Sequence, residues 1–133
     1  KIKKIGYNVI SVCHKTAIIS KTSHYGEGIK VFARGIINSG STIESNVLVN
    51  TGSIVEHDCH ICSHAQIAPG AILGGDVYVG EGSIVGMGAR VIQGVKIGKY
   101  CMIGAGTIIT KNVPDNTIIY NKQKNFHSKW PIK

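Results

Sequence analysis

An apolar residue recurs at every sixth position of this chain, and this period constrains the fold more than any other feature. The six-residue frame runs without insertion from 13 to 114, and all seventeen of its first positions, from Cys13 to Ile109, are apolar. A period of six fits neither an α-helix, with 3.6 residues per turn, nor the two-residue alternation of a plain strand. It is typical of a parallel β-helix, in which every six residues form a short strand and a corner. We therefore predict an all-β solenoid.

The other positions of the frame indicate how the side chains point. Fifth positions are small or β-branched, and fourth positions favour Gly, Asn and Asp, which tolerate the left-handed backbone angles of a sharp corner. We expect first and fifth positions to face inward. Three sixes close one coil, so equivalent residues of successive coils stack at about 4.8 Å and the frame makes about six coils. The predicted organisation is a junction over 1–12, a β-helix domain over 13–114 and a short irregular C-terminal tail over 115–133, acting as a cap or an arm.

Composition narrows the classes of partner. The chain is 43% hydrophobic but only 6% aromatic, which favours strands packed from Ile, Val and Ala. A net charge of +8 attracts phosphate-bearing ligands, but no nucleic-acid-binding motif accompanies it, so we predict no nucleic-acid partner. No apolar run is long enough for membrane insertion. Four cysteines are too few for a disulfide scaffold and favour a reducing cytoplasm. Outward-facing apolar residues predict a buried subunit interface.

The stretch 49–71 contains three histidines, and their directions decide what they can do. In the frame, His57 faces outward at a corner and Asp58 follows it. The sequence "CHIC" has zinc-like spacing, but Cys59 faces inward and Cys62 outward, so an intramolecular zinc site is not expected. Cys59, Cys13 and Cys101 are interpreted as small core residues. Cys62 is interpreted as exposed, with no evident role.

Two longer stretches carry a resemblance to known families. "VGEGSIVGMGARVIQGVKIGKYCMIGAGTII" resembles the left-handed β-helix of hexapeptide acyltransferases. "VEHDC" followed by "IAPGAILGGDVYVG" resembles the NeuD/PglD-like sugar O- and N-acetyltransferases, over roughly 12–116. The resemblance implies a left-handed coil, a homotrimer with active sites between prisms, and acetyl-CoA as co-substrate without a metal. It also implies transfer to a sugar or sugar nucleotide in bacterial surface-glycan synthesis, onto a sialic acid hydroxyl or an amino-sugar amine. Relatives carry a sugar-nucleotide domain before the junction.

The same resemblance assigns roles to residues. It makes His57 the general base and Asp58 the residue that orients its ring. An imidazole can take a proton from the attacking acceptor and return it to the leaving thiol. Gly75 lies one coil after His57, at the same corner, where its N–H can bind the oxyanion. The corresponding position in the family contacts the acetyl carbonyl, and Asn50 is assigned to the same acetyl-binding site.

The sequence departs from the family at two places. Gln66 stands where relatives have a second histidine that contacts the acetyl donor, and "IIYNKQKNF" replaces their usual ending along the coenzyme. Gln66 can hydrogen bond but cannot titrate. Four outward basic residues of the late coils are candidates for the coenzyme phosphates: Arg90, Lys96, Lys99 and Lys111.

Two alternatives remain open at this point. One is a non-catalytic β-helix that serves as a scaffold or assembly module, which Gln66 and the altered ending favour. The other, weaker alternative is a metal enzyme similar to the gamma-class carbonic anhydrases. That family has the pattern H-x-x-x-x-H, which the spacings among His57, His60 and His64 do not match.

Overall fold

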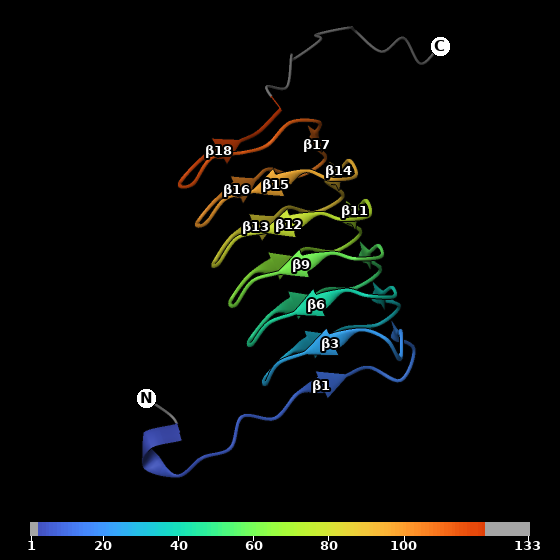
Figure 1. The fold of residues 1–133 in the computed structure, drawn as a ribbon, viewed down its shortest axis with the longest axis vertical. Helices are drawn as coiled ribbons and strands as arrows, with labels where there is room; N and C mark the ends of the chain where they lie inside the picture. Colours follow the sequence, from blue (N-terminus) through green and yellow to red (C-terminus); the bar gives the residue numbers. More distant parts are fainter. Residues whose placement is uncertain (1–2, 122–133) are drawn as a thin grey trace, which may run out of the picture.

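The computed structural model describes residues 3–121, which form a left-handed parallel β-helix of about six coils. Figure 1 shows the coils stacked in one column, from β1 at the N-terminal end to β18 at the C-terminal end. A single 3₁₀ turn, η1 (Lys3–Ile5), precedes the column. Within the described residues no helix has the length and apolar character needed to cross a membrane. The all-β prediction is confirmed.

Each coil contributes two-residue strands to three parallel sheets, which we call sheets A, B and C. Sheet A contains β1 (Val12–Cys13), β4 (Lys30–Val31), β7 (Leu48–Val49), β10 (Gln66–Ile67), β13 (Ile84–Val85), β16 (Met102–Ile103) and β18 (Ile118–Ile119). Sheet B contains β2 (Ile18–Ile19), β5 (Ile36–Ile37), β8 (Ile54–Val55), β11 (Ile72–Leu73), β14 (Arg90–Val91) and β17 (Ile108–Ile109). Sheet C contains β3 (His24–Tyr25), β6 (Thr42–Ile43), β9 (His60–Ile61), β12 (Tyr78–Val79) and β15 (Lys96–Ile97).

The strands pair between coils with an offset of three sixes. Ile72 of β11 lies opposite Ile54 on one side and Arg90 on the other. Backbone hydrogen bonds follow the same register, as in the 2.9 Å bond from Ile54 N–H to the Ala71 carbonyl. Three sixes therefore close one coil, as the period predicts.

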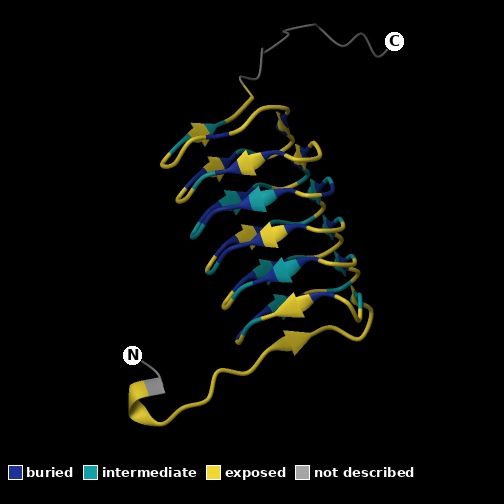
Figure 2. Ribbon diagram, viewed as in Figure 1, coloured by how far each residue is buried: buried dark blue, intermediate teal, exposed yellow. Residues whose placement is uncertain are grey.

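First and fifth positions of the frame form the core. From Val31 to Ile109 every first position is buried. Figure 2 shows dark blue, buried stretches recurring from coil to coil along the column. The prediction is wrong for the earliest coil, where Cys13 is exposed and Tyr25 is 57% exposed. Their strands, β1 and β3, are the first of sheets A and C, so no preceding strand covers them. A side chain that points inward is therefore buried only where its coil has a neighbouring coil on both sides.

The corners have the left-handed backbone angles that the fourth positions predict. Every fourth position from Gly28 to Gly106 has positive φ, including non-glycine residues such as Asn46 (59°) and Asp58 (59°). Asn and Asp adopt this region more readily than other side chains that bear a Cβ. The prediction of sharp corners is confirmed, and one of these corners is at Asp58.

The six-residue frame breaks after Ile109, but the coil continues. Val113 bridges to Ile97, and Ile118 of β18 lies opposite Met102, so both pairings fall short of a full three sixes. One corner is thus shorter than the others, which carries the solenoid into the segment for which the sequence predicts an irregular tail. Residues 122–133 of that predicted tail lie outside the described residues.

Candidate functional site

His57 and Asp58 form a hydrogen-bonded pair at the corner between sheets B and C. They lie in the turn that joins β8 to β9, with their side chains 50% and 66% exposed. The His57 Nδ1 atom is 2.8 Å from Asp58 Oδ2. The left-handed φ of Asp58 turns the chain sharply just after the histidine. The corner thus presents an imidazole to the surface with a carboxylate on one of its nitrogens.

The coil beneath holds this corner in place. The buried Ser41 hydroxyl donates to the Glu56 carbonyl at 2.8 Å and accepts from the Cys59 N–H at 3.1 Å. The Asp58 N–H donates to the Ser39 carbonyl at 2.9 Å. These bonds fix the backbone on both sides of the histidine, so the ring is positioned by the register of the solenoid.

Two glycines leave room for the pair. A Cβ added to Gly75, one coil further along, would lie 2.6 Å from His57 Nε2, so the ring packs directly against this glycine. A Cβ on Gly40, one coil earlier, would overlap the Asp58 carboxylate. The Gly75 amide N–H has no hydrogen-bond acceptor within residues 3–121. The predicted stacking of His57 on Gly75 is present in the structure.

The pair has the arrangement of a general base and its orienting group. With the proton on Nδ1, the ring donates to the Asp58 carboxylate and leaves the Nε2 lone pair free to accept a proton. A carboxylate at this distance also favours the protonated form of the ring. Nε2 is one of the ring atoms closest to Gly75, whose N–H is available as a donor. The corner therefore places an imidazole nitrogen beside a backbone N–H that has no acceptor among the described residues.

Asn50 and Gln66 lie away from this corner in the same chain. Asn50 is at the corner between sheets A and B, where its Oδ1 accepts from the Thr51 N–H at 2.7 Å. Gln66 points outward from β10 in sheet A and is exposed. A single chain therefore places them on other parts of the prism than His57.

The four predicted phosphate-binding residues are all exposed but are spread around the prism. Arg90 is on β14 in sheet B, Lys96 is on β15 in sheet C, Lys99 is at the corner between sheets C and A, and Lys111 follows β17. They form no single cluster on one face of the described structure.

The cysteines differ from one another in environment. Cys59 points inward as predicted, and its thiol donates to the Gly74 carbonyl at 3.2 Å. Burial raises the pKa of this thiol to about 11. Cys101 is buried as well. The prediction that Cys62 is exposed is wrong: it is 7% exposed, because the Tyr78 hydroxyl lies 3.1 Å from its sulfur. Burial raises the pKa of Cys62 too.

The other two histidines of the stretch have partners on the preceding coil. The His64 Nδ1 atom lies 2.8 Å from the Asn46 amide nitrogen. His60 Nε2 lies 2.7 Å from Glu44 Oε1, and this hydrogen bond lowers the pKa of Glu44 to about 2. Glu44 is not among the site residues predicted from the sequence. It stands one full coil before Cys62, so the coil register could have found it.

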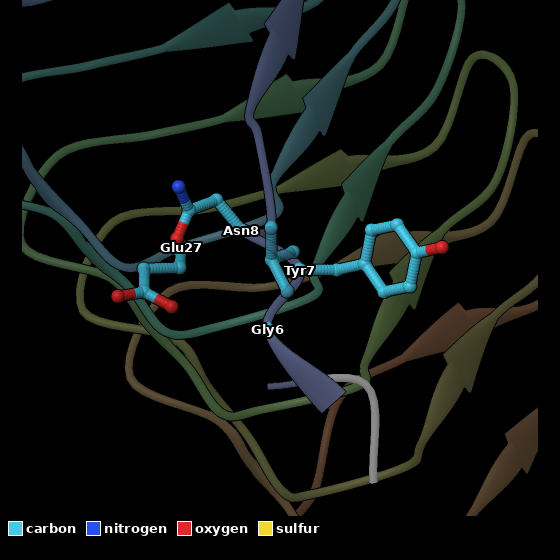
Figure 3. Close-up of a pocket in the computed structure, with 5 residues that line it drawn as sticks. Gly6, Tyr7, Asn8 and Glu27 are labelled. Carbon is cyan, nitrogen blue, oxygen red and sulfur yellow. The ribbon is translucent and has the colours of Figure 1, made fainter. Parts of the chain in front are cut away.

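A separate depression of about 390 Å³ lies at the N-terminal end. It is lined by Gly6, Tyr7, Asn8, Val9 and Glu27, and Figure 3 shows Asn8 and Glu27 on one side of the segment with the Tyr7 ring on the other. No histidine lines this depression, and it does not include His57 or Asp58, so the corner at His57 remains the candidate site.

Comparison with known proteins identifies a family and solved structures that are similar to this chain. The family described as bacterial transferase hexapeptide (six repeats) matches residues 40–75 and again 76–111, together more than half of the chain. Similar solved structures include a histidine-to-alanine variant of GDP-perosamine N-acetyltransferase from Caulobacter crescentus, in complex with CoA and GDP-perosamine. It is 35% identical with a TM-score of 0.86, and the match covers 87% of this chain and 55% of that one.

Two further structures extend the comparison. The acetyltransferase domain of PglB from Neisseria gonorrhoeae, in complex with acetyl coenzyme A, is 33% identical with a TM-score of 0.86, over 87% of this chain and 57% of that one. WeeI from Acinetobacter baumannii shares the fold. It is 24% identical with a TM-score of 0.78, and the match covers 90% of this chain and 59% of that one. The chain spans a little over half the length of these proteins. The predicted resemblance to sugar acetyltransferases is confirmed.

Proposed function

Because this chain belongs to the bacterial transferase hexapeptide family, we propose that it transfers an acetyl group from acetyl-CoA to a sugar or sugar nucleotide, with His57 as the general base. The observation that carries the proposal is the His57–Asp58 pair seated against Gly75. The relatives add support, since one was solved with acetyl coenzyme A and another with CoA and GDP-perosamine. They favour an amino-sugar amine as acceptor over a sialic acid hydroxyl.

The proposed reaction is direct transfer without a covalent enzyme intermediate. The acceptor nitrogen attacks the thioester carbonyl, and His57 Nε2 takes the proton that the acceptor loses. The carbonyl oxygen becomes an oxyanion, for which the Gly75 N–H is the proposed donor. When the carbon–sulfur bond breaks, His57 returns the proton to the CoA thiolate. Asp58 keeps the ring oriented throughout and offsets its positive charge.

We further propose that the complete site forms between subunits of a homotrimer. Asn50 and Gln66 lie on other parts of the prism than His57, so a neighbouring subunit is needed to bring them to the acetyl group. Large apolar side chains that an interface could bury are exposed on the strands of sheets A and B or directly after one of them: Ile18, Ile92, Met102, Ile108 and Ile118. Arg90, Lys96, Lys99 and Lys111 are the proposed partners of the coenzyme phosphates. The transfer itself needs no metal.

A thiol-release assay tests the proposal. The protein is incubated with acetyl-CoA and a panel of amino sugars, sialic acids and nucleotide-linked amino sugars, with correction for hydrolysis. Loss of a general base costs about 10²-fold to 10⁴-fold, so His57→Ala should lose that much of kcat. The matched control is His64→Ala, another exposed histidine of the same stretch, which should keep wild-type kcat within about twofold. Full activity of His57→Ala would refute the mechanism. Absence of both transfer and CoA binding would favour the scaffold alternative.

A further inference from the structure

Sheet C and the corner after it bring three metal-binding donor groups together, away from His57. His60 and Cys62 flank the inward-facing Ile61, so both point outward from the same strand end. Glu44 occupies the position equivalent to Cys62 one coil earlier. His60 pairs with Thr42 in the same register. The solenoid therefore stacks a carboxylate beside an imidazole and a thiol.

The donor atoms of these three residues converge. One ligand atom from each of Glu44, His60 and Cys62 lies within 4.8 Å of the other two, and His60 Nε2 is 2.7 Å from Glu44 Oε1. Donors of a tetrahedral zinc ion stand at about 2.0–2.3 Å from the metal, which places them roughly 3.3–3.8 Å from one another. Side-chain movements of about 1 Å would bring the group to that geometry. Carboxylate oxygen, imidazole nitrogen and thiolate sulfur are also the donor types that zinc takes.

Ser63 and Tyr78 contact the three donor residues in the way that neighbouring side chains hold the ligands of a metal site. The Ser63 N–H and hydroxyl both donate to Glu44 Oε2, at 2.9 and 2.8 Å, which leaves Oε1 directed at His60. The Tyr78 hydroxyl lies 3.1 Å from the Cys62 sulfur and can donate to a metal-bound thiolate. Such partners orient metal ligands and tune their affinity. The carboxylate and the thiol are therefore already held in place.

Space for an ion and a further ligand lies beside the group. An open depression of about 390 Å³ is lined by Glu44, Cys62, Ser63, His64, Tyr78, Glu81 and Lys99. An ion there would meet the Glu44 carboxylate and the Cys62 thiolate as negative ligand groups. Cys59, the other cysteine of "CHIC", takes no part, because its sulfur faces the core and bonds to Gly74.

We propose that Glu44, His60 and Cys62 bind one zinc ion, with the fourth position open to water or to an anionic ligand. Binding releases the Cys62 thiol proton to solvent and moves the His60 ring proton from Nε2 to Nδ1, so that three metal–ligand bonds replace the hydrogen bond between Glu44 and His60. The ion links the coil of β6 to the coil of β9 and so clips two neighbouring turns of the solenoid. The site is distinct from the His57 corner, and zinc there is not required for acetyl transfer.

Titration of the full chain with Co²⁺ as a spectroscopic probe tests this site. After chelator treatment, the wild-type protein should bind one Co²⁺ per chain with a dissociation constant below about 10 µM and show a thiolate-to-cobalt charge-transfer band. Zn²⁺ should displace the Co²⁺ and raise the thermal midpoint. Cys62→Ser should abolish the band, and Glu44→Gln should weaken binding at least tenfold.

Matched controls separate this site from adventitious binding. Cys13→Ser removes the exposed thiol and His24→Gln removes another outward histidine of sheet C, and neither should change affinity more than twofold. Circular dichroism establishes that each variant is folded. If Cys62→Ser does not fold, Glu44→Gln decides, because its side chain is partly exposed. The proposal is overturned by absence of stoichiometric binding, by full affinity in Glu44→Gln, or by a band that persists in Cys62→Ser or disappears in Cys13→Ser.

Discussion

Replacing Gly75 by alanine tests whether the position of the His57 ring controls the proposed reaction. The backbone of Gly75 is outside the left-handed region, so alanine causes no strain in the main chain. The new methyl group would instead lie 2.5 Å from His57 Cε1 and 2.6 Å from Nε2. Ordinary van der Waals contact begins near 3.4 Å, so the ring has to withdraw by about 0.9 Å.

A displacement of this size predicts a large kinetic effect and a small effect on stability. Misplacing a reacting group by about 1 Å can cost about 10²-fold in rate, which corresponds to about 2.7 kcal/mol of transition-state stabilisation. We therefore expect kcat of Gly75→Ala to fall about 10²-fold in the thiol-release assay. The His57 side chain is half exposed and can swing into solvent. The free energy of unfolding should accordingly change by less than about 1 kcal/mol, measured by urea denaturation.

A double-mutant cycle shows whether the loss acts through the ring. In a His57→Gln background the ring is absent, so Gly75→Ala should cost less than about threefold further. A crystal structure of Gly75→Ala should show the imidazole moved from its contact with residue 75. Wild-type kcat in Gly75→Ala, or a second 10²-fold loss in the His57→Gln background, would refute the reasoning.

Three other predictions concern Asp58, the cysteines and Glu44. Asp58→Asn should retain the fold, because Asn tolerates left-handed φ. It should lower kcat by roughly 10-fold to 10²-fold, because the negative charge beside the ring is lost but was already partly screened by solvent. Measuring kcat together with the thermal midpoint checks both expectations. A thiol reagent should label Cys13 within the folded protein and Cys59 only on unfolding, because Cys59 is buried with a pKa of about 11, as peptide mass spectrometry would show. In chelator-treated protein, the hydrogen bond from His60 lowers the pKa of Glu44 from its ordinary 4.5 to about 2. The ionised Glu44 therefore stabilises the folded state fully above pH 4.5, and this contribution is lost as pH falls through 2. Wild type should thus lose more stability than Glu44→Gln between pH 5 and pH 2 in urea denaturation, and equal losses would contradict this.

The sequence predicts the solenoid well because its period states which residues share a coil. Once three sixes are known to close a turn, the stacking of Gly75 on His57 follows, and the structure contains it. The inward direction of Cys59 follows for the same reason. These features depend on backbone register alone, which a repeating pattern encodes directly.

Features that depend on coil ends or on contacts between outward side chains were harder to predict. Cys13 has an inward position but no preceding strand to cover it. Cys62 has an outward position but is covered by Tyr78, which comes from the next coil. The continuation to Ile119 needs a corner shorter than the others, which no periodic frame contains. In each case the outcome depends on a specific neighbour rather than on the pattern.

Hydrogen bonding from each coil to the next makes the folding of this chain nearly one-dimensional. Each turn is stabilised by the turns above and below it, so thermal opening should begin at the two ends and proceed inward like a zipper. His57 and Gly75 follow the third and fourth strands of the six-stranded sheet B, the middle of the stack. The pair therefore occupies the part of the column that opens last, and partial unravelling at either end would leave it assembled.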